Sequence, residues 1–524
     1  MSATLFEGGR VHLGDGTSAE ALLVRDGRVA AVGRGEEVRR EAGRAERVDL
    51  RGGLMVPGWF DAHVHFVWWA RQMTQLDVAD TRTLDEALDR IGSRARALPD
   101  GAWILGGRFD KNAWGRWPTA AELDRVTAGH PAALRSRDGH SRWLNTAALE
   151  RAGITRATPA PEGGAIFHDE RGDPTGVLQE NANRLADVAL PPPTEDEMLE
   201  AARTGQREAW RRGIVGFENL DQFTGRAPLG VFQRMRDAGE LRLRVYQGIP
   251  HARLADALAQ GLRTGDGDEW LRTGHLKIFT DGALGSQTAA LEDPYEGSQD
   301  RGILTIEPGP LGRDVAAAAA AGIAVAIHAI GDRAVHVALD AIAPTRATAP
   351  ALRQKIEHVQ LVRADDLARF GSLGVIASMQ PVHATSDRDL ADRYWGPSRV
   401  GRSYPWRTLR GGGAVLAFGS DAPVEPIDPL VGIHAAVTRK RPRDTSPWTP
   451  EQRITLDEAL AAYAAGPAYA MSGEREWGTL REGMRCDATI VDRDLARLSG
   501  DEMLEARVRA TVIDGVVRFE EDLG

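Results

Sequence analysis

Two histidines stand at the end of an apolar stretch, in Asp61-Ala-His63-Val-His65. Side chains alternate between the two faces of a strand, so His63 and His65 point the same way if this stretch is a strand. Two imidazoles on one face can bind a single divalent metal ion. The alternative is a pair of histidines held only by hydrogen bonds, and the motif by itself leaves both interpretations open.

Further short apolar stretches each carry one side chain with metal-binding chemistry. They are Lys277 in His275-Leu-Lys-Ile-Phe, His328 in Ala326-Ile-His-Ala-Ile, His358 in Lys355-Ile-Glu-His-Val-Gln360, and Asp421 in Phe418-Gly-Ser-Asp-Ala-Pro423. A single histidine at a strand end is more often a core residue than a ligand. If the strands are parallel neighbours, however, all these side chains meet at one edge of the sheet. It is improbable that so many side chains of metal-binding type would meet there if each were only a structural residue. The set therefore predicts a metal centre.

The elements that would position these side chains are short strands alternating with helical stretches, a pattern typical of parallel βα units. Eight such strands close a barrel, and function is expected at their carboxyl ends. Thr83, Thr194 and Thr455, each followed three residues later by Glu, predict helix starts between strands. The expected strands are Leu54 to Phe66, Ile214 to Asn219, Leu241 to Gln247, His275 to Thr280, Ala324 to Ala329, Lys355 to Gln360, Gly374 to Met379 and Val415 to Asp421.

Both ends of the chain have a different pattern. Apolar runs flank Asp26-Gly27 near the start and Asp514-Gly515 near the end, and Asp-Gly favours the type I′ turn of a β-hairpin. Neither piece can bury a core alone, so we expect one small β-sandwich built from residues 1–56 and 473–524. Residues 57–472 would then form the barrel.

The stretch between the first two expected strands, from Phe66 to Ile214, is too long for one crossover helix. We expect an inserted subdomain at residues 67–190, placed over the barrel mouth because it follows the carboxyl end of the first strand. Its tryptophans could line a wall for a hydrophobic substituent of a substrate or could pack the core of the insert. The expected fold is thus α/β: a distorted (β/α)8 TIM barrel with a large insertion after strand 1 and a small β-sandwich.

Composition excludes several classes of protein. With 65 basic and 75 acidic residues the formal net charge is −10, and no Lys/Arg tract is present, so we expect no nucleic-acid or anionic-membrane partner. A lone cysteine, Cys486, excludes a disulfide framework and a Cys-X-X-Cys metal site, which leaves His and carboxylate ligands. The start of the chain lacks the pattern of a signal peptide, so we expect a cytoplasmic protein. The longest apolar run, Val315 to Ile330, contains His328 and falls short of the ~20 residues of a membrane span.

These residues resemble those of the amidohydrolase superfamily, and longer strings resemble its family 3, the YtcJ-like and N-substituted formamide deformylase-like branch. The resemblance covers nearly the whole chain. The strings that carry it are His275-Leu-Lys-Ile-Phe-Thr-Asp-Gly-Ala-Leu-Gly-Ser286, His328-Ala-Ile-Gly-Asp-Arg-Ala334, Met379-Gln-Pro-Val-His-Ala384 and Gly419-Ser-Asp-Ala-Pro-Val-Glu-Pro426.

The resemblance implies a site with one or two divalent ions, zinc being the first candidate. His63, His65 and Asp421 would hold the first ion and His328 and His358 the second. Lys277 would react with CO2 to give a carbamate that bridges the two ions. An unmodified Lys277, buried or paired with Asp281, is the alternative and would favour a single ion.

Two further histidines, His383 and His140, lie where the branch places groups that face the substrate, and either could polarise the carbonyl oxygen. Asp421 would also carry the proton from the attacking water to the leaving nitrogen, since an amine departs only when protonated. Both histidines could equally be structural residues, and Asp421 could be a turn or N-cap residue.

The expected function is hydrolysis of the C–N bond of a small amide, such as an N-substituted formamide or an N-acyl compound, by a metal-activated hydroxide. The same chemistry would also attack an ester, a lactone or a phosphotriester, so these remain alternatives. A non-catalytic protein that only retains a metal is a third possibility. By resemblance, a homodimer is expected.

Overall fold

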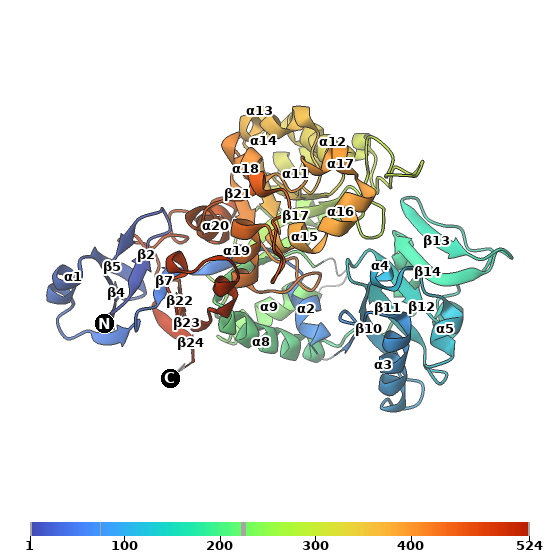
Figure 1. Cartoon of the computed structure of the whole chain (residues 1–524), viewed down its shortest axis with the longest axis horizontal. Coiled ribbons are helices and arrows are strands. Elements are labelled where there is room, and N and C mark those ends of the chain that lie inside the picture. The colour runs from blue at the N-terminus through green and yellow to red at the C-terminus, as the bar shows by residue number, and fades with distance from the viewer. Residues whose placement is uncertain (1–2, 74, 222–226, 522–524) are drawn as a thin grey trace.

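A sheet of eight parallel strands forms the centre of the computed structural model, which describes residues 3–73, 75–221 and 227–521 (Figure 1). Its order, β21-β20-β19-β18-β17-β16-β15-β8, follows the order in which these strands occur along the chain. The strands are β8 (Trp59–Val64), β15 (Ile214–Asn219), β16 (Arg244–Pro250), β17 (Leu271–Phe279), β18 (Val325–Ala329), β19 (Lys355–His358), β20 (Ile376–Met379) and β21 (Leu416–Phe418).

The first and last strands of this sheet approach each other and nearly close a barrel. Just beyond β21, the Asp421 N–H donates to the His63 carbonyl at 2.7 Å, and the His65 N–H donates to the Ala422 carbonyl at 2.9 Å. The Asp61 carboxylate accepts from the Ser420 N–H at 2.9 Å and from its hydroxyl at 2.6 Å. These contacts bring the ends of β8 and β21 together, and the predicted (β/α)8 fold class is confirmed.

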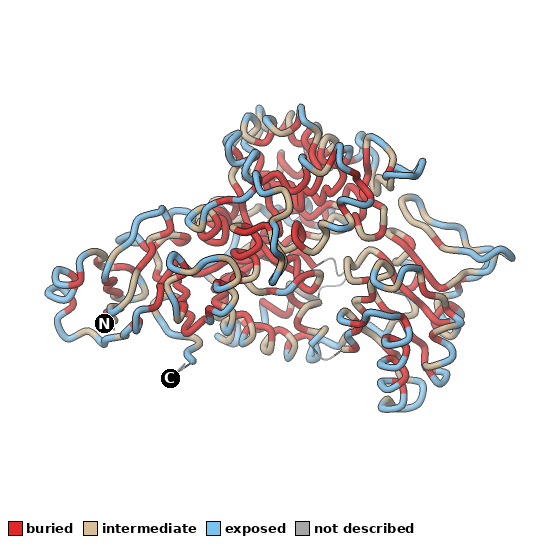
Figure 2. The backbone as a smooth tube through the Cα atoms, in the orientation of Figure 1, coloured by how far each residue is buried: buried red, intermediate tan, exposed pale blue. Residues whose placement is uncertain are grey.

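Helices cover the outside of the barrel, and buried segments run through the barrel as well as through the terminal β structure and the insert (Figure 2). The capping boxes predicted at Thr194 and Thr455 are present, and the Thr83 side chain accepts from the Glu86 N–H at 3.2 Å. The helices between and after the barrel strands are α8 (Glu195–Arg211), α9 (Ala227–Asp237), α10 (Leu254–Ala259), α11 (Pro308–Ala320), α12 (Asp332–Ile342), α13 (Thr345–Thr348), α14 (Leu367–Leu373), α15 (Pro381–Ser386), α16 (Arg388–Tyr394), α17 (Pro397–Val400), α18 (Trp406–Gly411), α19 (Pro429–Thr438), α20 (Leu456–Tyr463) and α21 (Ala465–Ala470).

The first predicted strand was wrong because it is divided into two. The run Leu54 to Phe66 is two strands, β7 (Leu54–Pro57) and β8, which belong to different sheets. The chain changes sheet at Gly58, whose N–H donates to the Asp487 carbonyl at 2.8 Å and where a Cβ would lie 2.4 Å from a Val215 methyl carbon. The break follows from the missing N–H of Pro57 and the close approach that only glycine permits.

The two ends of the chain share a second β structure. One sheet has the order β5-β4-β1-β6 and the other β24-β23-β22-β7-β2-β3. Both Asp-Gly hairpins are present, with positive φ at Asp26 (49°) and Asp514 (55°) and at the glycines that follow. The strands are β1 (Ala3–Glu7), β2 (Arg10–His12), β3 (Ser18–Ala19), β4 (Ala21–Arg25), β5 (Arg28–Gly33), β6 (Glu46–Asp49), β22 (Ala488–Val491), β23 (Val508–Ile513) and β24 (Val516–Glu520), with α1 (Gly35–Ala42) beside them.

These two sheets pack on one apolar cluster that includes Phe6, Leu22, Met55 and Val512. Strand β7 pairs with β22 in antiparallel fashion, so strands from both ends of the chain lie side by side (Figure 1). The limits 1–56 and 473–524 stay a prediction, and residues 1–2 and 522–524 lie outside the described residues.

The segment between β8 and β15 contains a six-stranded sheet in the order β13-β14-β12-β11-β10-β9. Trp143 is fully buried there and packs against Phe109 and Trp114, so these tryptophans belong to the core of the insert. Trp68 lies outside this core, on α2 (Phe66–Gln72). The remaining elements are β9 (Leu76–Asp77), β10 (Ile104–Phe109), β11 (Ala132–Ser136), β12 (Ser141–Leu144), β13 (Gly164–His168), β14 (Pro174–Glu180), α3 (Leu84–Arg96), α4 (Lys111–Trp114), α5 (Ala120–Asp124), α6 (Thr146–Arg151) and α7 (Asn183–Asp187).

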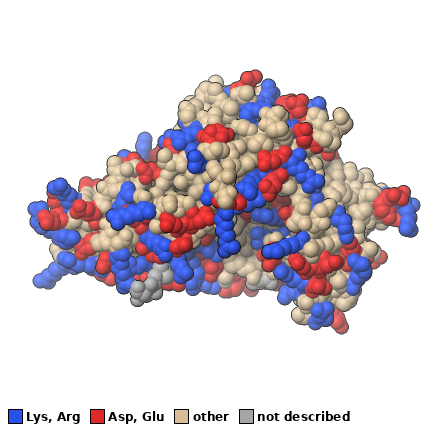
Figure 3. Space-filling model, viewed as in Figure 1, with Lys and Arg blue, Asp and Glu red and all other residues tan. Residues whose placement is uncertain are grey.

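The insert contacts loops that follow the carboxyl ends of barrel strands. Arg137 pairs with Glu425 at 2.7 Å, and the Ser286 hydroxyl donates to Asp138 at 2.7 Å. The insert therefore reaches the end of the barrel where function was expected, although its limits at 67 and 190 stay a prediction. Charged side chains of both signs are mixed over the visible face (Figure 3). Among the described residues, no helix has the length and apolar character needed to cross a membrane.

Candidate metal centre

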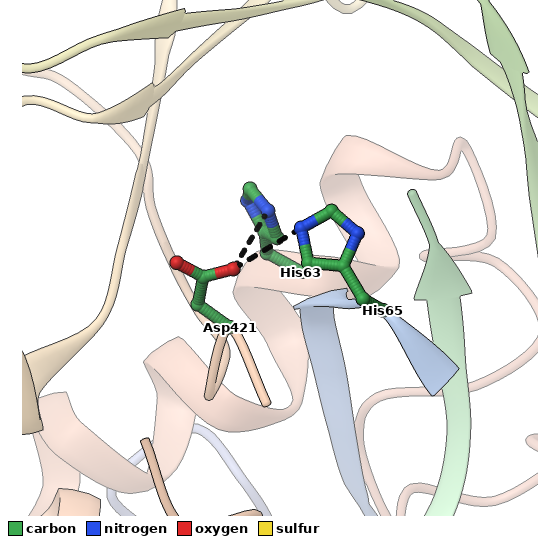
Figure 4. A group of neighbouring side chains, drawn as sticks. All are labelled: His63, His65 and Asp421. Carbon is green, nitrogen blue, oxygen red and sulfur yellow. Dashed lines mark ion pairs between the residues drawn. The ribbon is translucent and has the colours of Figure 1, made fainter. Parts of the chain in front are cut away.

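His63, His65 and Asp421 meet at the carboxyl ends of β8 and β21 (Figure 4). The Asp421 Oδ1 lies 3.3 Å from His63 Nε2 and 3.4 Å from His65 Nε2. One ligand atom from each residue falls within 4.8 Å of the others, which is the spacing of a group that could hold one metal ion. The structure thus brings together the three residues expected for the first ion.

A second group shares Asp421 and comprises His358 and His383. The Asp421 Oδ2 lies 3.9 Å from His358 Nδ1 and 3.7 Å from His383 Nε2. His328 is beside this group but in neither of the two: its ring centre is 4.5 Å from that of His358, while its Nε2 lies 3.0 Å from the Gly282 carbonyl oxygen. The assignment of His328 and His358 to the second ion stays a prediction, and His383 lies close enough to His358 and Asp421 to be a further candidate.

The chemistry of these groups fits a divalent ion. His383 Nε2 and Asp421 Oδ1 are buried without a hydrogen-bond partner among the described residues, and a buried polar atom without a partner is costly. Imidazole and carboxylate are the donors that zinc and similar ions take in the absence of cysteine. Burial opposes ionisation of Asp421, but the neighbouring imidazoles of His63 and His65 outweigh it and lower its pKa, so Asp421 is a carboxylate ready to bind a cation.

Unusual backbone conformations aim two of these side chains. His358 has φ 71° and Asp421 has φ 58°, in the left-handed region that non-glycine residues rarely adopt. Each such residue costs about 1–3 kcal/mol unless its surroundings hold it there, and such residues cluster at functional sites. The Asp421 N–H is held by the His63 carbonyl, so the contact that joins β8 to β21 also orients the carboxylate.

Lys277 is fully buried on β17, and its Nζ lies 3.4 Å from His63 Nε2. No carboxylate of the described residues forms an ion pair with it, and burial lowers its pKa to about 8. The alternative pairing with Asp281 is not formed, because the Asp281 carboxylate accepts backbone N–H groups of Ala290, Ile330 and Gly331.

Comparison with known proteins now decides the family. A model described as "Amidohydrolase family" matches residues 46–519 of the chain. The chain belongs to the amidohydrolase family.

Among curated proteins, the putative amidohydrolase YtcJ of Bacillus subtilis (strain 168) is 30% identical over 99% of each chain. The N-substituted formamide deformylase of Arthrobacter pascens is 30% identical over 96% of this chain and 95% of its own. Among solved structures, an uncharacterized metal-dependent hydrolase from Pyrococcus horikoshii OT3 aligns with a TM-score of 0.77 at 27% identity, covering 95% of this chain and 99% of that one. The predicted resemblance is confirmed, and the chain is one of the amidohydrolases, a family of metal-dependent hydrolases of C–N bonds.

In this amidohydrolase the insert adds His140 to the site. The His140 ring centre lies 5.3 Å from that of His328, and its Nδ1 lies 2.9 Å from Glu180 Oε2. Burial opposes the charge on His140, but the Glu180 carboxylate outweighs it and raises the pKa of His140 to about 9. At neutral pH His140 is therefore an imidazolium facing the centre, held by Glu180, a partner that the sequence did not reveal.

Beneath the centre, a chain of buried charges crosses the barrel interior. The Lys355 Nζ lies 2.7 Å from Glu357 Oε1 and 2.5 Å from Glu218 Oε2. Glu357 also contacts His63 Nδ1 at 2.7 Å, and Glu218 contacts His275 Nδ1 at 2.7 Å. All five side chains are fully buried. We call Lys355, Glu218, Glu357 and His275 the charge network.

The charge network also holds His63 in place. The two nitrogens of His275 lie 2.7 Å from the Glu218 carboxylate and 2.9 Å from the Arg353 carbonyl oxygen. The Glu357 carboxylate holds a proton on His63 Nδ1, which leaves Nε2 as the lone pair that faces Asp421. Charges at alternate positions of the apolar stretch Lys355-Ile-Glu357 were the signal that sequence reasoning missed.

Proposed function

We propose that this amidohydrolase cleaves the C–N bond of a small amide, an N-substituted formamide or an N-acyl compound, with one or two divalent ions of which zinc is the first choice. The observation that carries the proposal is the convergence of His63, His65 and Asp421 from opposite edges of one barrel sheet. The relative named N-substituted formamide deformylase supports the choice of amide.

Two sets of residues would hold the ions. His63, His65 and Asp421 would hold the first, and His358 with His328 or His383 would hold the second. A divalent ion in such a site lowers the pKa of a water from about 15.7 to about 7 and polarises a carbonyl group.

Lys277 would become a carbamate when its Nζ forms a bond to the carbon of CO2 and releases one proton. This reaction needs the neutral amine, and the lowered pKa of about 8 makes that form accessible near neutral pH. The proximity of its Nζ to His63, 3.4 Å, supports a place beside both groups of ligands.

The remaining roles concern protons and the carbonyl oxygen. Asp421 would accept the proton of the attacking water and deliver it to the leaving nitrogen, because amide nitrogen departs only as a protonated amine. His140 as an imidazolium, or His383 through its unpartnered Nε2, would stabilise negative charge on the carbonyl oxygen.

Three further properties stay proposals from the sequence: a cytoplasmic location, a homodimer, and the absence of a nucleic-acid partner. The lack of any Lys/Arg tract supports the last of these. Light scattering after size exclusion would test the dimer.

The decisive experiment joins metal analysis with substrate analogues. Elemental mass spectrometry on protein purified without chelator should give one or two equivalents of zinc per chain. The protein should then hydrolyse N-substituted formamides faster than the matching formate esters relative to their uncatalysed rates, and Asp421→Asn should slow the reaction by about 10²- to 10⁴-fold. Faster relative cleavage of esters would favour the ester hydrolase, and a bound metal with no turnover of any analogue would favour a binding protein.

A further inference from the structure

Arg135 on strand β11 of the insert has an unusual environment. Its side chain is half-buried, and the carbon of its guanidinium lies 5.2 Å from the centre of the Trp68 ring. No hydrogen bond or ion pair engages its guanidinium within the ranges that the structure describes. The two neighbouring arginines differ in this respect, because Arg137 pairs with Glu425 at 2.7 Å and Arg142 with Asp187 at 2.8 Å.

Trp68 connects Arg135 to the metal centre. It lies on α2, three residues after His65, and its ring centre is 5.6 Å from that of His65. Gly139 also faces this ring, since a Cβ there would lie 2.9 Å from it. Arg137 lies in the turn directly after β11 and pairs with Glu425 of the barrel, so this end of β11 lies against the barrel. Arg135 and Trp68 therefore form one wall beside the first metal group.

The positive charge of Arg135 indicates what kind of group this wall could bind. Arginine is rarely buried, even in part, without an acidic partner, and burial lowers the pKa of Arg135 to about 9. Asp187 and Asp221 act on it only at longer range. A guanidinium that stacks on an aromatic ring keeps its N–H donors free at the edge, and their planar fork matches a carboxylate.

We propose that Arg135, stacked on Trp68, binds a carboxylate of the substrate, so that the substrate class is an amide that also carries a carboxylate. The inference rests on the proposed amide hydrolysis and adds the second functional group to it. The metal centre would act on the amide while Arg135 holds the carboxylate. The spacing of these two sites would then select substrates by the distance between their amide and carboxylate groups.

The test compares two formamides that differ only in this group, N-formylphenylalanine and N-formylphenethylamine. We expect the metal-loaded wild type to favour the first in kcat/KM. A charge-assisted bidentate contact corresponds to about 10- to 100-fold, and Arg135→Met should reduce the ratio of the two kcat/KM values by that factor. Arg135→Lys keeps the positive charge but lacks the planar pair of N–H donors, so its ratio of kcat/KM values should lie between those of wild type and Arg135→Met. Equal ratios in wild type and Arg135→Met would overturn the inference while leaving amide hydrolysis intact.

A matched control and a second measurement separate this inference from the proposed function. Arg151 also stacks on a tryptophan, at 5.5 Å from Trp103, in another part of the insert, so Arg151→Met should leave the ratio unchanged. Calorimetric titration of the metal-free protein with N-formylphenylalanine needs no turnover. Weaker binding to Arg135→Met than to Arg151→Met supports the carboxylate site even if neither formamide is hydrolysed, and equal binding to both variants contradicts it.

Discussion

Lys355→Met tests whether the charge network stabilises the protein. The Lys355 ammonium lies within 2.7 Å of both Glu218 and Glu357, and all three side chains are fully buried. Methionine fills similar space but leaves Glu357 with no cation, and removing one partner of a buried ion pair costs about 3–5 kcal/mol. The pKa of Glu218 gives a similar figure: burial would raise it, but His275 and Lys355 lower it from 4.5 to about 2, which corresponds to about 3 kcal/mol.

The assay is urea unfolding of the metal-free protein at neutral pH, followed by fluorescence. A loss of about 3–5 kcal/mol of unfolding free energy should lower the urea midpoint of the barrel transition by roughly 1 M. The matched control is Lys355→Met with Glu357→Gln, which removes one charge of each sign. It should recover much of the loss, because a balanced pair can be replaced by neutral side chains at little cost.

The pH dependence has a definite sign. The pKa of Glu218 is lower in the folded protein than in the unfolded chain, so its contribution is present above about pH 4.5 and is lost as pH falls toward about 2. The difference in unfolding free energy between wild type and Lys355→Met should therefore decrease as the pH is lowered. A variant that unfolds at the wild-type midpoint at pH 7, or a double variant as unstable as the sum of its singles, would refute the reasoning.

Three other predictions follow from the centre. Asp421→Asn should reduce hydrolysis by about 10²- to 10⁴-fold, measured as kcat/KM; an unchanged rate would remove Asp421 from proton transfer. Chelation should lower the thermal unfolding midpoint, and zinc at about 100 times its dissociation constant should restore about 2.7 kcal/mol of unfolding free energy. A midpoint that does not change with zinc would contradict metal binding by these residues. Glu180→Gln should move the pKa of His140 from about 9 toward 6.5, followed by NMR of the metal-free protein, so that the imidazolium is lost at lower pH; a pKa still near 9 would show that Glu180 is not its cause.

The strand ends that carry the candidate metal-binding residues could be predicted from the sequence, because polar residues follow apolar stretches of strand periodicity there. His63 and Asp421 each interrupt an apolar run, and a parallel barrel brings such interruptions to one end. The strand limits were less accurate: β17 begins at Leu271, before the predicted His275, and the run from Leu54 divides at Gly58. Those limits depend on partner strands distant in sequence.

The geometry within the centre could not be predicted from the sequence. The grouping of His358 and His383 with Asp421 joins residues of β19, α15 and the segment after β21, which are separated in sequence and meet only in the folded barrel. Likewise, Glu180 and Glu357 act on histidines that lie 40 and 294 residues away in sequence. A single sequence contains no periodic signal for such contacts.

The pairing of β7 with β22 sets the order in which the molecule can be completed during synthesis. Residues 54–57 leave the ribosome long before their partners at 488–491, and at about 5–20 residues per second the delay is on the order of 20 to 90 s. Through that interval the apolar strand β7 has no antiparallel partner on this side, and β8, which carries His63, continues directly from it. His63 is thus translated early but acquires its Asp421 partner only after most of the chain has emerged, so the candidate metal centre can form only late in synthesis.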